Sequence, residues 1–102
     1  MLQSFADRRA APRIDVQIEA LVIVPHQFHA RVTILDRSEG GCRIRLRQPL
    51  NLPQRFVIEF DGMAYLCERR WANAESMGVQ FIDILSRAQR RELSGLLATA
   101  RL

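Results

Sequence analysis

The chain of 102 residues is 48% hydrophobic and 25% charged, a composition typical of one globular domain rather than of a disordered segment or of two domains. Its longest apolar run, ALVIVP at 20–25, is far shorter than the roughly 20 residues of a membrane helix, and the N-terminus lacks a signal-peptide pattern, so we expect a cytoplasmic protein without membrane insertion. All 15 lysine-or-arginine positions are arginine, giving a net charge of +4, which indicates an anionic partner or simply a GC-rich genome.

The first 13 residues carry arginines and show no alternation of apolar with polar side chains. Arg8, Arg9 and Arg13 lie in this stretch, which we interpret as a flexible arm, either binding a ligand or forming a solvated basic tail. From Ile14 onward apolar residues alternate with polar ones, a pattern that predicts a half-buried strand interrupted at Pro25.

Two more strands and a connecting loop are expected next. The second strand is predicted over 28–35 and the third over CRIRLR at 42–47, with its three arginines on one face that is either solvated or next to a ligand or partner. Between them, DRSEGG at 36–41 is predicted to be a loop in which the glycines supply a positive φ or a bulge.

The rest of the chain predicts three strands and one helix. The strands are expected over 55–60, 63–71 and 77–82. Asp61 and Gly62 form a strong hairpin signal, because the two-residue turns that match strand twist need positive φ. Ser86 and Gln89 then fit a capping box, and apolar residues continue at helical spacing to the C-terminus.

This order of elements predicts a mainly β fold: a six-stranded antiparallel β-barrel with a C-terminal α-helix packed against one opening or side. The expected organisation is a single domain over 1–102, with an arm at 1–13 and the barrel and helix at 14–102.

No catalytic or metal-binding pattern is present in the sequence. Cys42 and Cys67 lack CxxC spacing and are interpreted as small core residues in a reducing compartment. His26 and His29 are three apart near a strand, where that spacing puts them on opposite faces. We therefore expect neither an enzyme, nor a metal site, nor a cofactor.

Two motifs resemble the binding signatures of the PilZ family. RAAPR at 9–13 matches RxxxR, and DRSEGG at 36–41 matches [D/N]xSxxG, in the family's order. Trp71 followed by GVQF at 78–81 is similar to the family's late strand pair, an aromatic residue, a turn and GVxF. Each motif alone recurs by chance, but both together in one short domain are more specific, and the similarity runs from about Arg8 to the terminal helix.

PilZ domains are six-stranded barrels that sense the bacterial second messenger cyclic di-GMP, so the resemblance implies roles for the arm. Arg9 and Arg13 would contact guanine edges and phosphates, with Arg8 as an additional phosphate contact. An arginine arm that folds over the ligand loses conformational entropy, and the charge-assisted bidentate hydrogen bonds that it forms offset this loss.

The resemblance also implies roles beyond the arm. Asp36 and Ser38 would hydrogen-bond the ligand from the loop between the second and third strands, and Gly41 would let the backbone approach closely. Trp71 would be a stacking surface or a wall of the site; alternatively it is a core residue.

The resulting interpretation is a cyclic di-GMP receptor that signals in trans, through the position of its arm, to an unidentified protein effector in motility, biofilm or polysaccharide regulation. One alternative is a PilZ-like adaptor that binds protein and no nucleotide. Another is a small basic barrel for single-stranded nucleic acid, which is disfavoured because only Phe5, Tyr65 and Trp71 are available for stacking. The oligomeric state, monomer or dimer, is left open.

Overall fold

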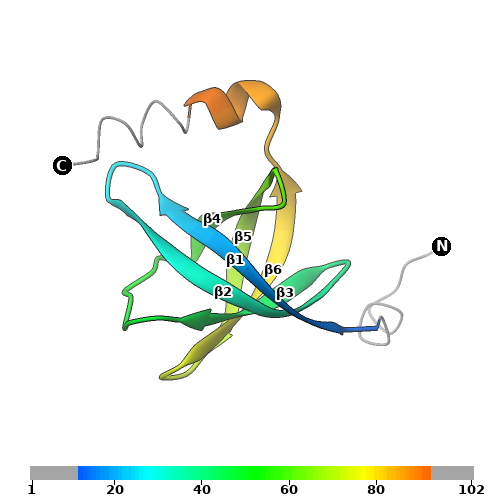
Figure 1. The fold of residues 1–102 in the computed structure, drawn as a ribbon. Coiled ribbons are helices and arrows are strands. Elements are labelled where there is room, and N and C mark those ends of the chain that lie inside the picture. The colour runs from blue at the N-terminus through cyan, green and yellow to red at the C-terminus, as the bar shows by residue number, and fades with distance from the viewer. Residues whose placement is uncertain (1–11, 93–102) are drawn as a thin grey trace.

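The computed structural model describes residues 12–92, so the expected arm up to residue 11 and the helical spacing beyond residue 92 lie outside the described residues. Six antiparallel strands form a closed barrel in the order β1-β2-β3-β6-β5-β4, which confirms the predicted fold (Figure 1). The strands are β1 (Ile14–Val24), β2 (Phe28–Ser38), β3 (Gly41–Leu46), β4 (Arg55–Phe60), β5 (Met63–Ala72) and β6 (Ser76–Ile84).

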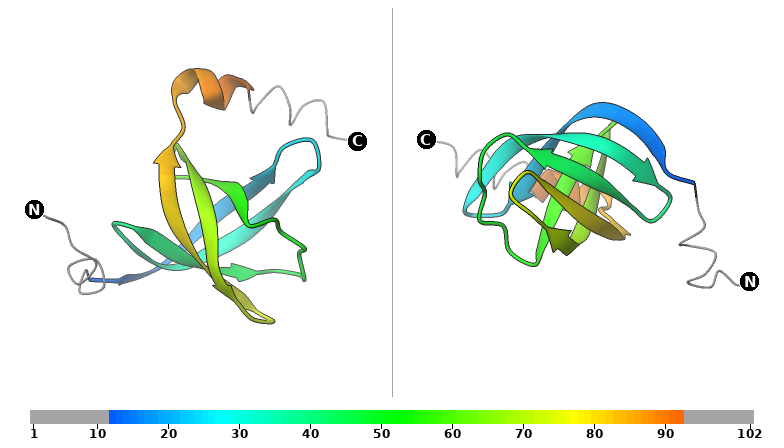
Figure 2. Two further views of the ribbon diagram at one scale, coloured as in Figure 1. Left: turned by 180° about the vertical axis from the view of Figure 1, so that it is seen from behind. Right: turned by 90° about the horizontal axis from the view of Figure 1, so that it is seen from below.

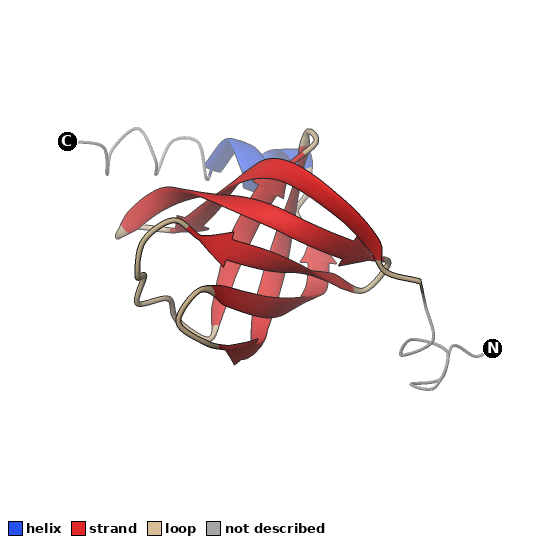
Figure 3. Cartoon of the chain, turned by 60° about the horizontal axis from the view of Figure 1, so that its bottom comes forward, coloured by secondary structure: helices blue, strands red, loops and turns tan. Residues whose placement is uncertain are grey.

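The turns show why the chain reverses where it does. Asp61 and Gly62 have φ of 52° and 75°, the positive values expected for the two-residue turn between β4 and β5. His26, with φ of 66°, lies in the turn after Pro25 that joins β1 to β2. The longest connection between strands, over 47–54, follows β3 (Figure 3), and its Leu52 is buried in the core.

One prediction about the β2–β3 connection is wrong. The segment at 36–38 belongs to β2, and Ser38 pairs with Gly41, so the loop predicted over 36–41 is reduced to a two-residue turn. Neither glycine of this hairpin has a positive φ, and the irregularity in the β2–β3 register falls earlier, between Ile34 and Asp36. Asp36 and Ser38 therefore lie on a strand, where backbone pairing fixes their positions.

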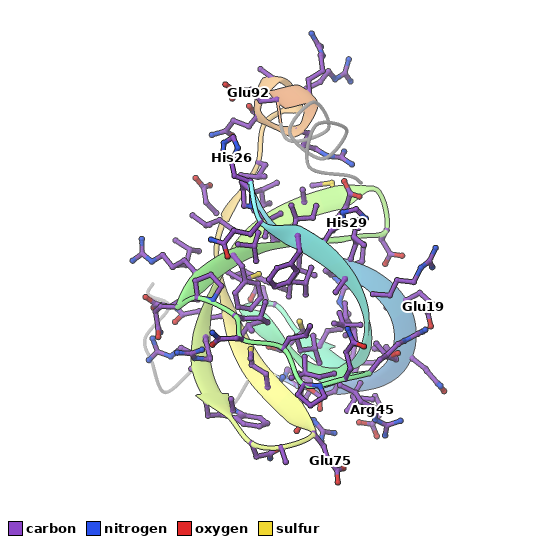
Figure 4. The ribbon with its side chains drawn as sticks, turned by 90° about the vertical axis from the view of Figure 1, so that its left-hand side faces the viewer. Glu19, His26, His29, Arg45, Glu75 and Glu92 are labelled. Carbon is purple, nitrogen blue, oxygen red and sulfur yellow. The ribbon has the colours of Figure 1, made fainter. Side chains whose placement is uncertain are left out.

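The barrel interior is filled by alternating apolar side chains of all six strands, as the period of two predicts (Figure 4). Buried residues of this core include Val22, Val24, Val32, Ile34, Cys42, Ile44, Phe56, Ile58, Phe60, Cys67, Met77 and Val79. Cys42 and Cys67 are free, buried thiols, which confirms their interpretation as core residues.

A second, smaller cluster covers part of the outer wall. Ile23, Val57 and Ala64 are buried there on β1, β4 and β5, with Leu85 packed against them. The chain then enters a helix over 87–92, which lies at one end of the barrel (Figures 1 and 2).

Hydrogen bonds at the start of this helix confirm the predicted capping box. The Ser86 N–H donates to Gln89 Oε1 at 2.7 Å, and the Gln89 N–H donates to Ser86 Oγ at 3.1 Å. Arg90 then ties the helix to the β4–β5 turn by donating to the Gly62 carbonyl oxygen at 2.7 Å.

Candidate functional site

A row of polar and aromatic positions crosses the outer wall of the barrel over four adjacent strands. Asp36 on β2 pairs with Arg43 on β3, Arg43 pairs with Gly78 on β6, and Gly78 pairs with Trp71 on β5. Directly paired residues of a sheet share a face, and neighbouring strands are about 4.8 Å apart. These four positions therefore form one continuous strip on the outside of the barrel.

Two register shifts turn the ends of this row outward. Ile34 pairs with the core residue Ile44, so uninterrupted alternation would send Asp36 into the barrel; the shift between them places it opposite Arg43 instead. A second shift, between Arg69 and Trp71 on β5, does the same for Trp71. Bulges of this kind re-aim side chains, and here they bring a carboxylate and an indole to the same wall.

The carboxylate of Asp36 is held by two arginines from different strands. Arg13, just before β1, donates to Oδ1 through Nε at 2.9 Å and through Nη2 at 2.6 Å. Arg43 donates through Nε to Oδ2 at 2.7 Å. Arg13 is within reach because β1 begins beside the β2–β3 hairpin, with Ile14 paired to Arg37 (Figure 2).

The two arginines determine the charge state of Asp36. Its side chain is only 9% exposed, and burial alone would raise the pKa of a carboxyl group. The hydrogen bonds from Arg43 and Arg13, together with their positive charges, outweigh burial and bring the pKa of Asp36 below its usual value. Asp36 is therefore ionised at neutral pH and accepts hydrogen bonds only.

The Trp71 indole lies over Gly78 on the neighbouring strand. A Cβ on Gly78 would be 2.1 Å from the indole Nε1, so the absence of a side chain at Gly78 is what makes room for the ring. Trp71 is 45% exposed, which rules out the alternative that it is a core residue. The indole thus presents a large apolar surface to solvent.

These groups line a hollow of about 390 Å³ on the outer wall. Its lining consists of Arg13, Asp36, Cys42, Arg43, Arg70, Trp71, Gly78 and Val79. Three arginines and one carboxylate line the hollow, so its lining has a net positive charge. Arg13 and Arg43 pair with Asp36, whereas the Arg70 guanidinium pairs with Glu68 at 3.3 Å. A planar wall beside several fixed cations can accept an anionic ligand that has aromatic rings.

The structure brings together three of the site residues expected from the sequence and places two others nearby. Arg13, Asp36 and Trp71 line the hollow, whereas Ser38 and Gly41 lie further along the β2–β3 hairpin and are not among its lining residues. A Cβ on Gly41 would be 2.2 Å from the carbonyl oxygen of Val79, so this glycine allows β3 and β6 to approach. The expected contacts of Arg8 and Arg9 lie outside the described residues.

Sequence reasoning missed three contributors to the site. The sequence leaves open the role of the arginine face that includes Arg43, and it predicts no role in the site for Arg70 or Gly78. The sequence does place Arg43 outward on its strand, but only the register shows that it faces Asp36. Arg70 reaches the hollow because it is the residue at the irregularity in β5.

Within residues 12–92, the histidines and cysteines form no metal site and no reactive thiol. His26 and His29 are both exposed on the outside of the barrel (Figure 4). Within residues 12–92, no group of three or more His, Cys, Asp or Glu side chains could hold a metal ion. Burial raises the pKa of the Cys42 thiol to about 12 and that of the Cys67 thiol further, so both are protonated at neutral pH. The described helix is too short to span a membrane.

The chain is similar to a known protein family. Residues 7–99 match the sequence model of the PilZ domain, which therefore covers nearly the whole chain. None of the curated proteins compared with the chain matches it.

Proposed function

Because the chain belongs to the PilZ domain family, a family of cyclic di-GMP receptors, we propose that it binds cyclic di-GMP in the hollow around Asp36. The observation that carries the proposal is the pairing of the two motifs in space. Arg13, the last residue of RxxxR, donates twice to Asp36, the first residue of [D/N]xSxxG, although 23 positions separate them in the chain.

The chemistry of the ligand fits these groups. Cyclic di-GMP joins two phosphates in a compact ring that carries two guanines. Arginine binds phosphate oxygens and the N7 and O6 edge of guanine through paired hydrogen bonds. An ionised carboxylate accepts hydrogen bonds from the guanine N1–H and amino group, and the Trp71 face offers a stacking surface of the kind that binds bases.

Arg13 and Arg43 take different parts in this proposal. Arg13 precedes the barrel and its side chain is half exposed, so it can turn from Asp36 toward a phosphate. Arg43 is held in the middle of the sheet and keeps Asp36 ionised and oriented when Arg13 moves away. Arg8 and Arg9 would add contacts from the arm, and Ser38, on the same face of β2 as Asp36, would contact the ligand at the edge of the site.

In this proposal the protein acts as a receptor rather than as a catalyst, and it signals to a protein effector through its arm. Nucleic acid binding is less well supported, because Trp71 is the one aromatic residue among residues 12–92 that is well exposed to solvent. Tyr65, which the sequence left available for stacking, is half-buried and stacks against Phe60 and Phe81, with ring centroids 5.3 and 4.5 Å away.

Isothermal titration of the full chain with cyclic di-GMP tests the proposal, with GTP as the control ligand. Arg13→Ala should weaken binding roughly 10- to 100-fold, the loss expected for hydrogen bonds to a charged group. Arg31→Ala is the matched control, since Arg31 is an exposed arginine of β2 that does not line the hollow.

The two variants distinguish a local site from general charge attraction. An equal loss in Arg31→Ala would indicate charge attraction alone. The proposal would be contradicted if the wild-type protein is folded, as judged by circular dichroism, but shows neither heat of binding in the titration nor binding in equilibrium dialysis. That result would favour the adaptor that binds protein only.

A further inference from the structure

A second hollow, of about 310 Å³, lies between the β2–β3 turn and the last residues of β6. It is lined by Glu39, Tyr65, Phe81, Ile82, Asp83 and Ile84. None of these residues lines the hollow around Asp36, so this is a separate surface.

Two isoleucines and two aromatic rings line this hollow beside its carboxylates. Ile82 is 41% and Ile84 is 52% exposed, although both belong to β6. Tyr65 and Phe81 stack with ring centroids 4.5 Å apart and are both half-buried. Exposed isoleucines beside half-buried aromatic rings are the features of a surface that another molecule covers.

The charged residues that line this hollow are negative, whereas the chain as a whole has a net positive charge. Its two charged lining residues are the carboxylates of Glu39 and Asp83, and no arginine is among the described lining residues, although the chain has a net charge of +4. Asp83 is oriented by its own backbone, because its Oδ1 accepts a hydrogen bond of 2.9 Å from the Ile84 N–H. Two carboxylates beside aromatic rings favour a cationic group.

The same group of aromatic rings already binds one guanidinium within the chain. The Arg37 guanidinium lies 5.1 Å from the centroid of the Phe60 ring, and its Nη1 is 3.5 Å from Asp61 Oδ2. Phe60 in turn stacks on Tyr65, with centroids 5.3 Å apart. The second hollow repeats this combination of aromatic ring and carboxylate with no arginine in its described lining.

We propose that this hollow is a docking site for a partner protein, which inserts an arginine side chain flanked by apolar residues. The guanidinium lies against Tyr65 and Phe81 and pairs with Glu39 and Asp83, and the apolar neighbours cover Ile82 and Ile84. Arginine suits this environment better than lysine, because its guanidinium is planar, more weakly hydrated and stacks on aromatic rings.

This site and the proposed nucleotide site both involve the β2–β3 hairpin. Glu39 lies in the turn between Ser38 and Gly41, and the Gly40 carbonyl oxygen accepts a hydrogen bond of 2.8 Å from the Phe81 N–H. The docking proposal nevertheless goes beyond the proposed function, because no contact in it requires cyclic di-GMP.

Titration by nuclear magnetic resonance, without nucleotide, tests the docking site on the full chain. The probe is a blocked tripeptide of leucine, arginine and leucine, and the control peptide has glutamine in place of arginine. The arginine peptide should shift the Ile82 and Ile84 methyl signals saturably, with weak affinity of roughly 0.1–1 mM as expected for so small a ligand. The glutamine peptide should bind at least several-fold more weakly.

A charge-neutral variant isolates the two carboxylates. Glu39→Gln combined with Asp83→Asn should weaken binding of the arginine peptide roughly three- to tenfold, whereas Glu75→Gln, an equal type of charge change at the β5–β6 turn, should leave it unchanged. The proposal is overturned if the isoleucine signals do not respond, if both peptides bind equally, or if the double variant binds like the wild type.

Two other occupants would also overturn it. Dilution-dependent shifts of the isoleucine signals without peptide would assign the hollow to a second copy of the chain. Tighter peptide binding after Arg8→Gln and Arg9→Gln would assign it to the chain's own N-terminal segment. In either case the titration of the wild-type chain with cyclic di-GMP is interpreted separately, because the hollow around Asp36 shares no lining residue with this one.

Discussion

Replacing Asp36 by asparagine should destabilise this protein even though the two side chains have nearly the same shape. The carboxylate accepts from Arg13 on one oxygen and from Arg43 on the other. An asparagine has one acceptor oxygen and one amino group, so it can satisfy one arginine while its amino group meets the donors of the other.

The contacts set the size of the effect. A hydrogen bond between charged groups contributes about 1.5–3 kcal/mol. Arg13 and Arg43 are about half exposed, and water partly replaces the lost partner, so the lower part of this range applies. We expect Asp36→Asn to lower the free energy of unfolding by about 1–2 kcal/mol, which corresponds to a fall in Tm of roughly 5–10 °C.

The loss should depend on pH in a defined direction. The pKa of Asp36 is lower in the folded chain than in the unfolded chain, where a free aspartate has a pKa of about 4. Its contribution to stability is therefore fully present above about pH 4 and disappears as the pH falls through the folded-state pKa. Asparagine does not titrate, so the difference between wild type and variant should shrink in acid.

Urea denaturation of both proteins between pH 7 and pH 3 measures this difference, and the contributions of the other carboxyl groups largely cancel. Glu75→Gln, at an exposed position of the β5–β6 turn, is the control and should change stability little at any pH. A variant as stable as the wild type at pH 7, or a difference that stays constant down to pH 3, would refute the role assigned to the two arginines.

Three further outcomes follow from local geometry. Gly41→Ala should lower stability by about 1–3 kcal/mol in urea denaturation, because its Cβ would meet the Val79 carbonyl oxygen at 2.2 Å; an unchanged midpoint would contradict this contact. Ser86→Ala should cost about 1 kcal/mol by removing the cap, and Ser86→Asp should restore most of it if capping is the reason. Cys42 and Cys67 should react with a thiol reagent only as fast as the chain unfolds, and rapid reaction in the native protein would contradict their burial.

Most of the fold could be predicted from the sequence because alternation and turn chemistry are local. The core side of CRIRLR follows from period two, and Asp61-Gly62 identifies its turn without knowledge of the partner strands. The Ser86 and Gln89 cap is likewise contained in four residues.

The candidate site depends on pairing between strands and could be predicted only in part. The motifs identified Arg13, Asp36 and Trp71, but strict alternation sends Asp36 to the same face as Ile34 and gives no reason to place it opposite Arg43. The register shifts that turn Asp36 and Trp71 outward arise from how β2 and β5 pair with their neighbours. Arg70 could not have been found without the second of these shifts.

The indole N–H signal of Trp71 offers the most direct test of where cyclic di-GMP binds. Trp71 is the only tryptophan in the chain, so its N–H gives one assignable resonance. Titration with cyclic di-GMP should move this signal saturably, at the same concentrations that release heat in calorimetry, and GTP should not move it. Heat of binding without any response of the Trp71 N–H would place the ligand elsewhere and contradict the site around Asp36.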